Sequence, residues 1–188
     1  MAHRQLHYAT ASHRQVIDLF VPQERRAQDR ERAFPLLVFV HGGAWVSETN
    51  GDHYDLAEYI TQHAAIAVAL LDYRLSSRQP RSDSVCHPAH LADVFGALDM
   101  LTSDEVAHEH GFAAQGIVLA GHSAGAWMTL AVALDSHAAQ SSTSAVDPIA
   151  PIPPLAPRIR ASIKAFVCSV RGTRRGKRGG RMLTPPAF

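Results

Sequence analysis

Two hydrophobic patterns alternate along the chain: short, nearly continuous apolar runs and longer segments in which apolar residues recur at helical spacing. The apolar runs are typical of strands that are buried on both faces of a sheet, and they cover residues 15–21, 35–40, 65–71 and 116–120. Helical spacing occurs over residues 55–63, 90–101 and 124 to about 135. This alternation predicts an α/β fold in three layers, with helices covering both faces of a mostly parallel sheet.

Residues 163–170 predict one further strand, after which the apolar pattern stops. Residues 1–157 carry nine Lys/Arg and seventeen Asp/Glu, whereas residues 158–188 carry nine Lys/Arg and no acidic residue. We therefore expect a partial domain over 1–170 and a disordered basic tail, rich in Gly and Arg, over 171–188.

The basic tail is the feature that would suit a nucleic acid, because Lys and Arg release counterions from phosphates. Six basic residues lie among glycines between Arg171 and Arg181, but no aromatic residue is interleaved with them. The residues that would stack on bases are therefore absent from this run, which argues against a nucleic-acid partner.

The rest of the composition predicts a cytoplasmic protein. No stretch approaches the ~20 apolar residues that a membrane span needs, and the first sixteen residues lack the apolar core of a signal peptide. Cys86 and Cys168 have no metal-like spacing and suggest no disulfide framework, so we expect a reducing compartment and no bound metal.

The strand at 116–120 runs directly into Gly121-His122-Ser123-Ala124-Gly125, and a helical pattern follows. A serine on a sharp strand-to-helix turn exposes its hydroxyl, and glycines two residues to either side leave room for the crossing chain. The pattern predicts that Ser123 is a nucleophile; the alternative is a tight turn whose serine only caps the helix.

The strand at 35–40 ends in His41-Gly42-Gly43-Ala44-Trp45. In an H-G-G-x arrangement the N–H groups of Gly43 and Ala44 would join that of Ala124 as donors to an oxyanion. A plain turn at the end of the strand is the alternative. Trp45 would contact an aromatic substrate or pack in the core.

Four segments resemble the α/β-hydrolase fold and, more narrowly, its arylformamidase (kynurenine formamidase) branch, and the resemblance covers roughly residues 15–170. These segments are 41–45, 72–76 (Asp-Tyr-Arg-Leu-Ser), 87–94 (His-Pro-Ala-His-Leu-Ala-Asp-Val) and 121–125. The resemblance implies that Ser123 is the nucleophile, that Gly43, Ala44 and Ala124 line the oxyanion hole, and that no cofactor is needed. The implied substrate is a small acyl compound or a formyl amide, and the family reaction removes formate from N-formyl-L-kynurenine in tryptophan breakdown.

Within these segments, Arg74 and Asp93 predict an ion pair between a loop and a helix. The chain departs from the family where the catalytic acid and base should follow, since no Asp or Glu occurs after Asp147 and no His after His137. Asp135 and His137 would lie at the far end of the helix, and His122 adjoins the serine without facing it. His41 would organise its loop, with a role as substitute base as the less favoured alternative.

We therefore expect a fold that lacks its last strands and helices, for which a truncated or shifted reading frame is the simplest explanation. Hydrolysis would be impaired, and the exposed sheet edge would promote self-association. A carboxylesterase of the hormone-sensitive-lipase type is the alternative activity. A non-enzymatic remnant with a basic nucleic-acid-binding tail is the alternative of a different class.

Overall fold

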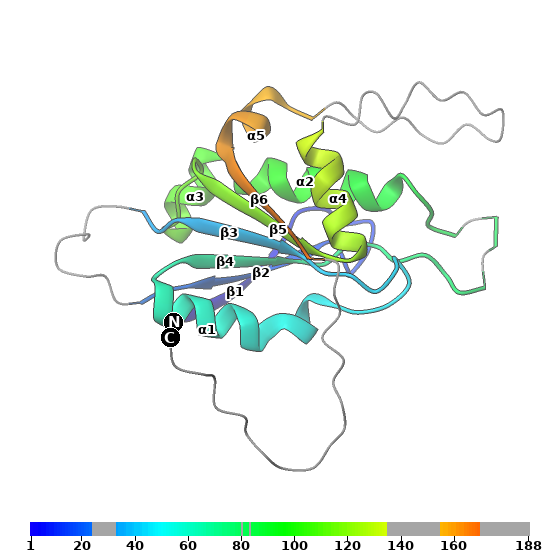
Figure 1. Cartoon of the computed structure of the whole chain (residues 1–188), viewed down its shortest axis with the longest axis horizontal. Helices are drawn as coiled ribbons and strands as arrows, with labels where there is room; N and C mark the ends of the chain where they lie inside the picture. The colour runs from blue at the N-terminus through cyan, green and yellow to red at the C-terminus, as the bar shows by residue number, and fades with distance from the viewer. Residues whose placement is uncertain (24–32, 80, 83, 135–154, 170–188) are drawn as a thin grey trace, which may run out of the picture.

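The computed structural model describes residues 1–23, 33–79, 81–82, 84–134 and 155–169 (Figure 1). One sheet has the strand order β1-β2-β4-β3-β5-β6. The strands are β1 (Ala2–His7), β2 (Val16–Val21), β3 (Leu36–Val40), β4 (Ala67–Leu71), β5 (Ile117–His122) and β6 (Ile163–Ser169). The helices are η2 (Asn50–His53), α1 (Tyr54–Ala64), α2 (Ala89–Leu101), α3 (Asp104–His110), α4 (Ala124–Ala133) and α5 (Pro157–Ser162).

The sheet is covered on both faces, which confirms the three-layer α/β prediction. Figure 1 shows α1 on one face and the other α-helices on the opposite face. Alternate residues of β4 serve the two sides: Val68 and Leu70 pack in the cluster beneath α1, whereas Ala69 and Leu71 pack in the larger cluster with α2 and α4. The period of two along a strand therefore feeds two separate cores.

The helix predicted over 90–101 forms as α2, and its predicted apolar face is buried. This face consists of Leu91, Val94, Phe95, Leu98 and Leu101. These side chains recur at intervals of three or four residues, so they lie on one side of the helix and pack against the sheet.

Strand β1 was not predicted, because most of its side chains are exposed and give no hydrophobic signal. It pairs antiparallel with β2, with Ala2 opposite Val21 and His7 opposite Val16. β2 in turn pairs antiparallel with β4, whereas β3–β4, β3–β5 and β5–β6 are parallel pairs. The parallel part of the sheet thus holds the strands that carry the motifs.

At the other side of the sheet, β6 pairs with β5 and, among the described strands, with no other. Every residue of β6 after Ile163 is exposed, including Phe166 (41%) and Val167 (54%). The predicted basic tail, residues 171–188, lies outside the described residues.

No helix in the described part of the chain has the length and apolar character that crossing a membrane requires. Cys86 and Cys168 are both free thiols and exposed.

Candidate active site

The two sequence motifs meet at the carboxyl ends of neighbouring strands. β3 and β5 are parallel neighbours, and Val40 at the end of β3 pairs with Gly121 near the end of β5. A side-chain carbon placed on Gly42 would lie 3.2 Å from Cβ of Ser123. The backbone after β3 therefore packs directly against the serine turn after β5, where ligands of open α/β sheets bind.

Ser123 occupies a strained turn between β5 and α4. Its φ of 52° and ψ of −113° lie in a region that residues with a side chain rarely adopt. Helix α4 begins at the next residue, Ala124, and the Ser123 carbonyl accepts a hydrogen bond of 3.1 Å from the N–H of Trp127. A strained backbone of this kind costs on the order of 1–3 kcal/mol and is typical of functional sites.

The glycines on either side of Ser123 are required by close backbone approach. A side-chain carbon on Gly125 would overlap the carbonyl oxygen of Val40, so the first turn of α4 lies directly on the end of β3. A side-chain carbon on Gly121 would lie 2.5 Å from both Gly125 and the Thr129 hydroxyl. The G-x-S-x-G spacing therefore reflects packing of backbone on backbone around the serine.

The residues after His41 form a left-handed turn. Gly43, Ala44 and Trp45 have φ of 82°, 52° and 60°. The N–H groups of Val46 and Ser47 both donate to the Gly43 carbonyl, at 3.0 and 3.1 Å. Two of the three left-handed residues have side chains, so this loop is the second strained segment beside Ser123.

The N–H groups that open the two turns have no acceptor within the described structure. This holds for Gly43 and Ala44 at the start of the left-handed turn and for Ala124 at the start of α4. The first N–H groups of a helical turn have no partner inside it, so they are available to a ligand. The Ser123 hydroxyl likewise has no hydrogen-bond partner among the described residues.

His41 is fully buried, and both of its ring nitrogens have hydrogen-bond partners. Nε2 lies 3.0 Å from Oδ1 of Asp72, and Nδ1 lies 3.2 Å from the Gly42 carbonyl oxygen. A histidine without exposed surface and without a free nitrogen cannot take a proton from Ser123, so the geometry supports the predicted role of His41 in organising its loop over the alternative of a substitute base.

Asp72 is the centre of the network that supports this loop. Besides His41 it accepts a hydrogen bond of 2.7 Å from Arg14, whose guanidinium also donates to the carbonyls of Glu48 and Tyr73. The Glu48 carboxylate accepts from the N–H of Gly42 at 3.2 Å. Arg14 and Glu48 had no motif to mark them in the sequence.

Tyr73 also supports this loop through contacts with His41 and Gly42. Its hydroxyl donates to the carbonyls of His41 (3.1 Å) and Gly42 (2.9 Å), and its ring stacks on the imidazole with centroids 4.3 Å apart. Burial raises the pKa of Tyr73, so its hydroxyl stays protonated and keeps both hydrogen bonds.

The predicted ion pair forms between Arg74 and Asp93, with contacts of 2.7–3.1 Å. The Asp93 side chain is buried, and its hydrogen bonds raise the pKa of Arg74. The pair joins the segment after β4 to α2. Gln15 also donates to Asp93 at 2.8 Å, so Asp93 links three segments.

Trp45 lies half-buried at the rim, packing against the larger core and against Trp127 of α4, with ring centroids 5.8 Å apart. His122 is half-buried beside Gly42. The other two residues considered as acid and base, Asp135 and His137, lie outside the described residues. Within the described residues, no group of three or more His, Cys, Asp or Glu is arranged to hold a metal ion.

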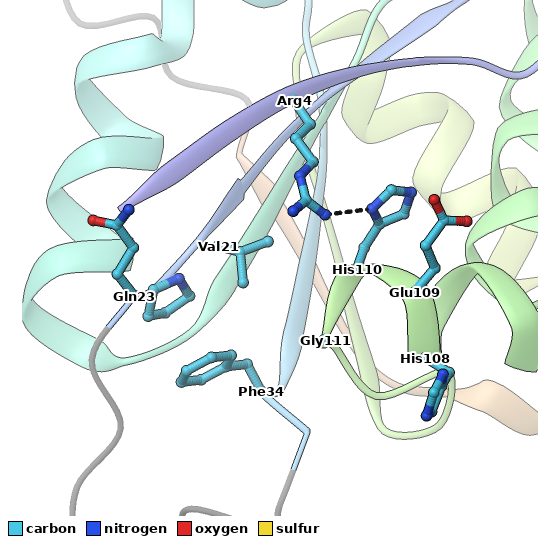
Figure 2. Close-up of a pocket in the computed structure, with 9 residues that line it drawn as sticks. Arg4, Val21, Gln23, Phe34, His108, Glu109, His110 and Gly111 are labelled. Carbon is cyan, nitrogen blue, oxygen red and sulfur yellow. Dashed lines mark hydrogen bonds between the residues drawn. The ribbon is translucent and has the colours of Figure 1, made fainter.

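A hollow of about 460 Å³ lies at the opposite end of the strands, beside Phe34, which precedes β3 (Figure 2). Figure 2 shows Arg4 of β1 and His110 of α3 pointing toward each other, and their side chains are 2.8 Å apart. His108 and Glu109 also line it and are exposed. His108-Glu109-His110 thus forms a largely solvated end of helix α3.

The comparisons with known proteins agree with this geometry. The family model described as alpha/beta hydrolase fold matches residues 37–172. A kynurenine formamidase of Meyerozyma guilliermondii is 32% identical over 97 residues, which are 51% of this chain and 32% of that protein. The chain thus spans about a third of the length of this relative.

Two solved esterases show the same fold. Esterase 2 of Thermogutta terrifontis, phosphorylated by paraoxon, matches with a TM-score of 0.55 and 22% identity over 67% of this chain and 45% of that chain. Esterase B of Lactobacillus rhamnosis matches with a TM-score of 0.57 and 24% identity over 73% and 42%. The chain spans less than half of either structure. From the family match over most of its length, together with the serine turn and the glycine-rich loop at one edge of the sheet, the chain belongs to the α/β-hydrolase fold family.

Proposed function

We propose that this chain is a serine hydrolase whose nucleophile is Ser123 and whose substrate is a small formyl amide or acyl compound, as in kynurenine formamidase. One observation carries the proposal: a strained serine at the start of a helix lies against a second strained loop. Between them the two segments hold three N–H groups that have no acceptor among the described residues.

In the proposed reaction, Oγ of Ser123 attacks the formyl carbon and passes its proton to a water molecule, and the carbonyl oxygen becomes negatively charged. The N–H groups of Gly43, Ala44 and Ala124 donate to this oxyanion, and loss of one such donor typically lowers kcat by about 100- to 1,000-fold. The C–N bond then breaks as the oxyanion returns to a carbonyl, and the nitrogen leaves as an amine after it takes a proton back from water. Water hydrolyses the formyl ester, which releases formate and restores the serine.

We propose that the chain by itself reacts slowly. Among the described residues none hydrogen-bonds the Ser123 hydroxyl, and His41 is fully engaged elsewhere. An unactivated serine is a poor nucleophile, although an oxyanion hole and substrate binding alone leave a residual acceleration of about 10³–10⁴ over water. A reactive phosphorylating agent is therefore a better first probe than turnover.

The first test is the covalent reaction of the chain with paraoxon, followed by intact-mass and peptide mass spectrometry. We expect a single diethylphosphoryl adduct on Ser123, which is absent from Ser123→Ala and retained in Ser103→Ala, a matched change at the start of α3. An adduct that persists in Ser123→Ala would show that another residue is the nucleophile.

An esterase is the second candidate, which the two solved esterases favour. Turnover of N-formyl-kynurenine and of p-nitrophenyl acetate, each corrected by the rate of Ser123→Ala, separates the two activities. A higher kcat/KM for the formyl amide supports the formamidase. A higher value for the ester replaces it by the esterase, and the absence of serine-dependent turnover with either substrate favours a non-enzymatic protein.

We also propose that two copies of this chain associate through β6, whose exposed edge carries Phe166 and Val167. Sedimentation velocity at increasing concentration should show a dimer that Val167→Lys weakens at least about tenfold. Tyr59→Lys, a matched change on the exposed side of α1, should leave it intact. A chain that stays monomeric at every concentration contradicts this proposal.

The cytoplasm is the compartment that we propose, because two exposed cysteines are free thiols and a reducing environment preserves them. Microscopy of a fluorescent fusion tests the location, and enrichment in a secretory compartment would contradict it.

A further inference from the structure

The chain contains a single asparagine, Asn50, and the residue after it is Gly51. Asn50 begins η2, the short 3-10 helix that leads into α1, and it is only 8% exposed. An asparagine loses ammonia from its side chain most readily when glycine follows it, because glycine has no side-chain carbon to block the approach of its own backbone nitrogen. The surroundings of Asn50 therefore decide what this chemistry does to the fold.

The backbone nitrogen of Gly51 lies beside the Asn50 amide. Its N–H donates to Oδ1 of Asn50 at 2.9 Å, so the nitrogen is next to the group that it would attack. Gly51 is exposed, and among the described residues a side-chain carbon added to it would meet only the Thr49 hydroxyl, at 3.4 Å. The fold does not require glycine at this position, so alanine can replace it in a test.

The amide nitrogen of Asn50 is bonded to a buried carboxylate, that of Asp18 in β2. The two groups are 2.6 Å apart, and Asp18 is 1% exposed. Tyr54, the first residue of α1, donates to the same carboxylate oxygen at 2.6 Å. Burial, followed by this hydrogen bond, raises the pKa of Tyr54 to about 12, so its hydroxyl stays protonated. Asp18 thus ties η2 and the start of α1 to the sheet.

The other oxygen of Asp18 is also occupied. It accepts a hydrogen bond of 3.2 Å from Gln5 and lies 3.0 Å from Nε2 of His3, both on β1. Every partner of this carboxylate must present an N–H or an O–H, and the amide of Asn50 does so. A carboxylate at position 50 has no hydrogen to donate, and it would bring a second negative charge into contact with Asp18 in a buried position.

We propose that Asn50 is a modification site, at which loss of ammonia replaces the amide by a carboxylate and breaks the contact between η2 and Asp18. In the first step the Gly51 nitrogen gives its proton to hydroxide and attacks Cγ of Asn50. The bond from Cγ to Nδ2 breaks, and Nδ2 takes a proton from water and leaves as ammonia, so that a succinimide ring remains. Water then opens the ring at either of its two carbonyls, which yields aspartate or isoaspartate.

The folded network slows this reaction, because the Asn50 side chain must turn away from Asp18 before the ring can close. Opening of a short helix at the surface costs less free energy than unfolding of the whole chain, so the reaction proceeds from a locally opened form. The change is one-way, since the new carboxylate is repelled by Asp18 when η2 closes again. The modification therefore accumulates with the age of the molecule and loosens the start of α1.

The single asparagine makes the reaction simple to measure, because ammonia lost from an asparagine can come only from position 50. The full chain is incubated in mildly alkaline buffer, and peptide mass spectrometry follows the formation of aspartate and isoaspartate. We expect conversion in the folded chain, and Gly51→Ala should slow it at least about tenfold, because the added carbon hinders the nitrogen.

Gly96→Ala is the matched control for this rate. A side-chain carbon there makes an ordinary contact of 3.5 Å with the Tyr8 ring, far along the chain from Asn50, so the rate should not change. Equal rates in Gly51→Ala and the unmodified chain would overturn the role of the Gly51 nitrogen. A folded chain that keeps its amide for as long as the urea-unfolded chain needs to convert completely would overturn the site itself.

Asn50→Asp introduces one product directly and tests its effect on the fold. We expect the Tm to fall by at least about 5 °C at neutral pH, because the buried position does not stabilise two carboxylates in contact. Gln62→Glu makes the same change from amide to carboxylate at an exposed position of α1 and should shift the Tm by no more than about 1 °C. Equal Tm values for the two variants would overturn the effect of the modification.

An exchange of the two groups separates repulsion from the loss of a hydrogen bond. Asp18→Asn combined with Asn50→Asp keeps one carboxylate and one amide in contact, so it should recover at least about half of the loss in Tm. A double variant that is no more stable than Asn50→Asp alone would show that repulsion by Asp18 is not the cause. None of these measurements involves Ser123, so their outcome is independent of the proposed hydrolase.

Discussion

A hollow lies at each end of the parallel strands, and it is the smaller one that adjoins strained backbone and buried polar contacts. At the carboxyl ends of β3 and β5, a pocket of about 260 Å³ adjoins strained backbone at Ser123 and Ala44 and a buried carboxylate network. At the opposite end, a hollow of about 460 Å³ is lined by exposed Arg4, His108 and Glu109 (Figure 2). Strained backbone and buried polar contacts persist only where the rest of the fold stabilises them. They therefore mark a candidate functional site better than the volume of a hollow does.

The largest effect on stability is expected from a side chain added at the first turn of α4, beside the candidate active site. Gly125→Ala would force a carbon into the Val40 carbonyl oxygen, so we expect a loss of about 4 kcal/mol or more in the free energy of unfolding. Gly116→Ala is the matched control, because a side-chain carbon there meets nothing within 4 Å and only its φ of 82° is unfavourable.

Urea denaturation followed by circular dichroism measures both variants. We expect Gly116→Ala to lose only about 1–2 kcal/mol. If Gly125→Ala were no less stable than Gly116→Ala, the close contact of α4 with β3 would be wrong.

The next comparison is between two carboxylates, Asp72 at the end of β4 and Glu109 near the opposite end of the strands. Asp72→Ala leaves Arg14 and His41 without their shared partner in a buried setting, so we expect a loss on the order of 3–5 kcal/mol. Because the loop after β3 would lose its support, the rate of paraoxon labelling of Ser123 should fall at least about tenfold.

Glu109→Ala, at the opposite end of the strands, is exposed and should change the free energy of unfolding by no more than about 0.5 kcal/mol, with unchanged labelling. Thermal denaturation and timed mass spectrometry give both quantities. Equal effects of the two substitutions would show that the two ends of the strands do not differ in this way.

The smallest predicted effect is a dependence of stability on pH. The pKa of His90 falls from an ordinary value of about 6.5 to about 4 in the folded chain, so the unfolded chain takes up a proton that the folded chain refuses. Stability contributed by neutral His90 is therefore complete above about pH 6.5 and is lost as the pH falls toward 4. We expect a decrease on the order of 1–2 kcal/mol between pH 7.5 and 5.

His90→Gln should reduce this decrease, whereas His108→Gln, a change of the same kind at an exposed position, should leave it unchanged. Urea titrations at the two pH values test the prediction. A steeper decrease in His90→Gln than in the unmodified chain would show that the sign is wrong.

The sequence predicted the layers and most strands because buried parallel strands carry continuous apolar runs. It did not predict β1, whose Arg4 and Gln5 are exposed and which pairs with β2 along its whole length. Local patterns are sufficient where side chains face a core, and insufficient where a strand with exposed side chains is recognised through pairing with a partner elsewhere in the chain.

The same distinction holds for the site. The serine turn could be predicted because Gly121, Ser123 and Gly125 report a local backbone requirement. The supporting network could not, since Arg14 and Asp72 are 58 residues apart and join only after the sheet has formed. The pocket beside the serine turn was out of reach for the same reason, because its lining comes from four separate segments and only Trp45 was considered for substrate contact.

The contact of Gly125 with the end of β3 has a consequence for how this scaffold can change. The position of Ser123, the proposed nucleophile, is set by main chain packed against main chain, whereas the walls of the neighbouring pocket are side chains such as Trp127. We therefore expect substitutions that reshape the walls to leave the Ser123 hydroxyl in place. Ligand preference can diversify on this framework independently of the chemistry, which makes the wall positions the natural targets for redesign.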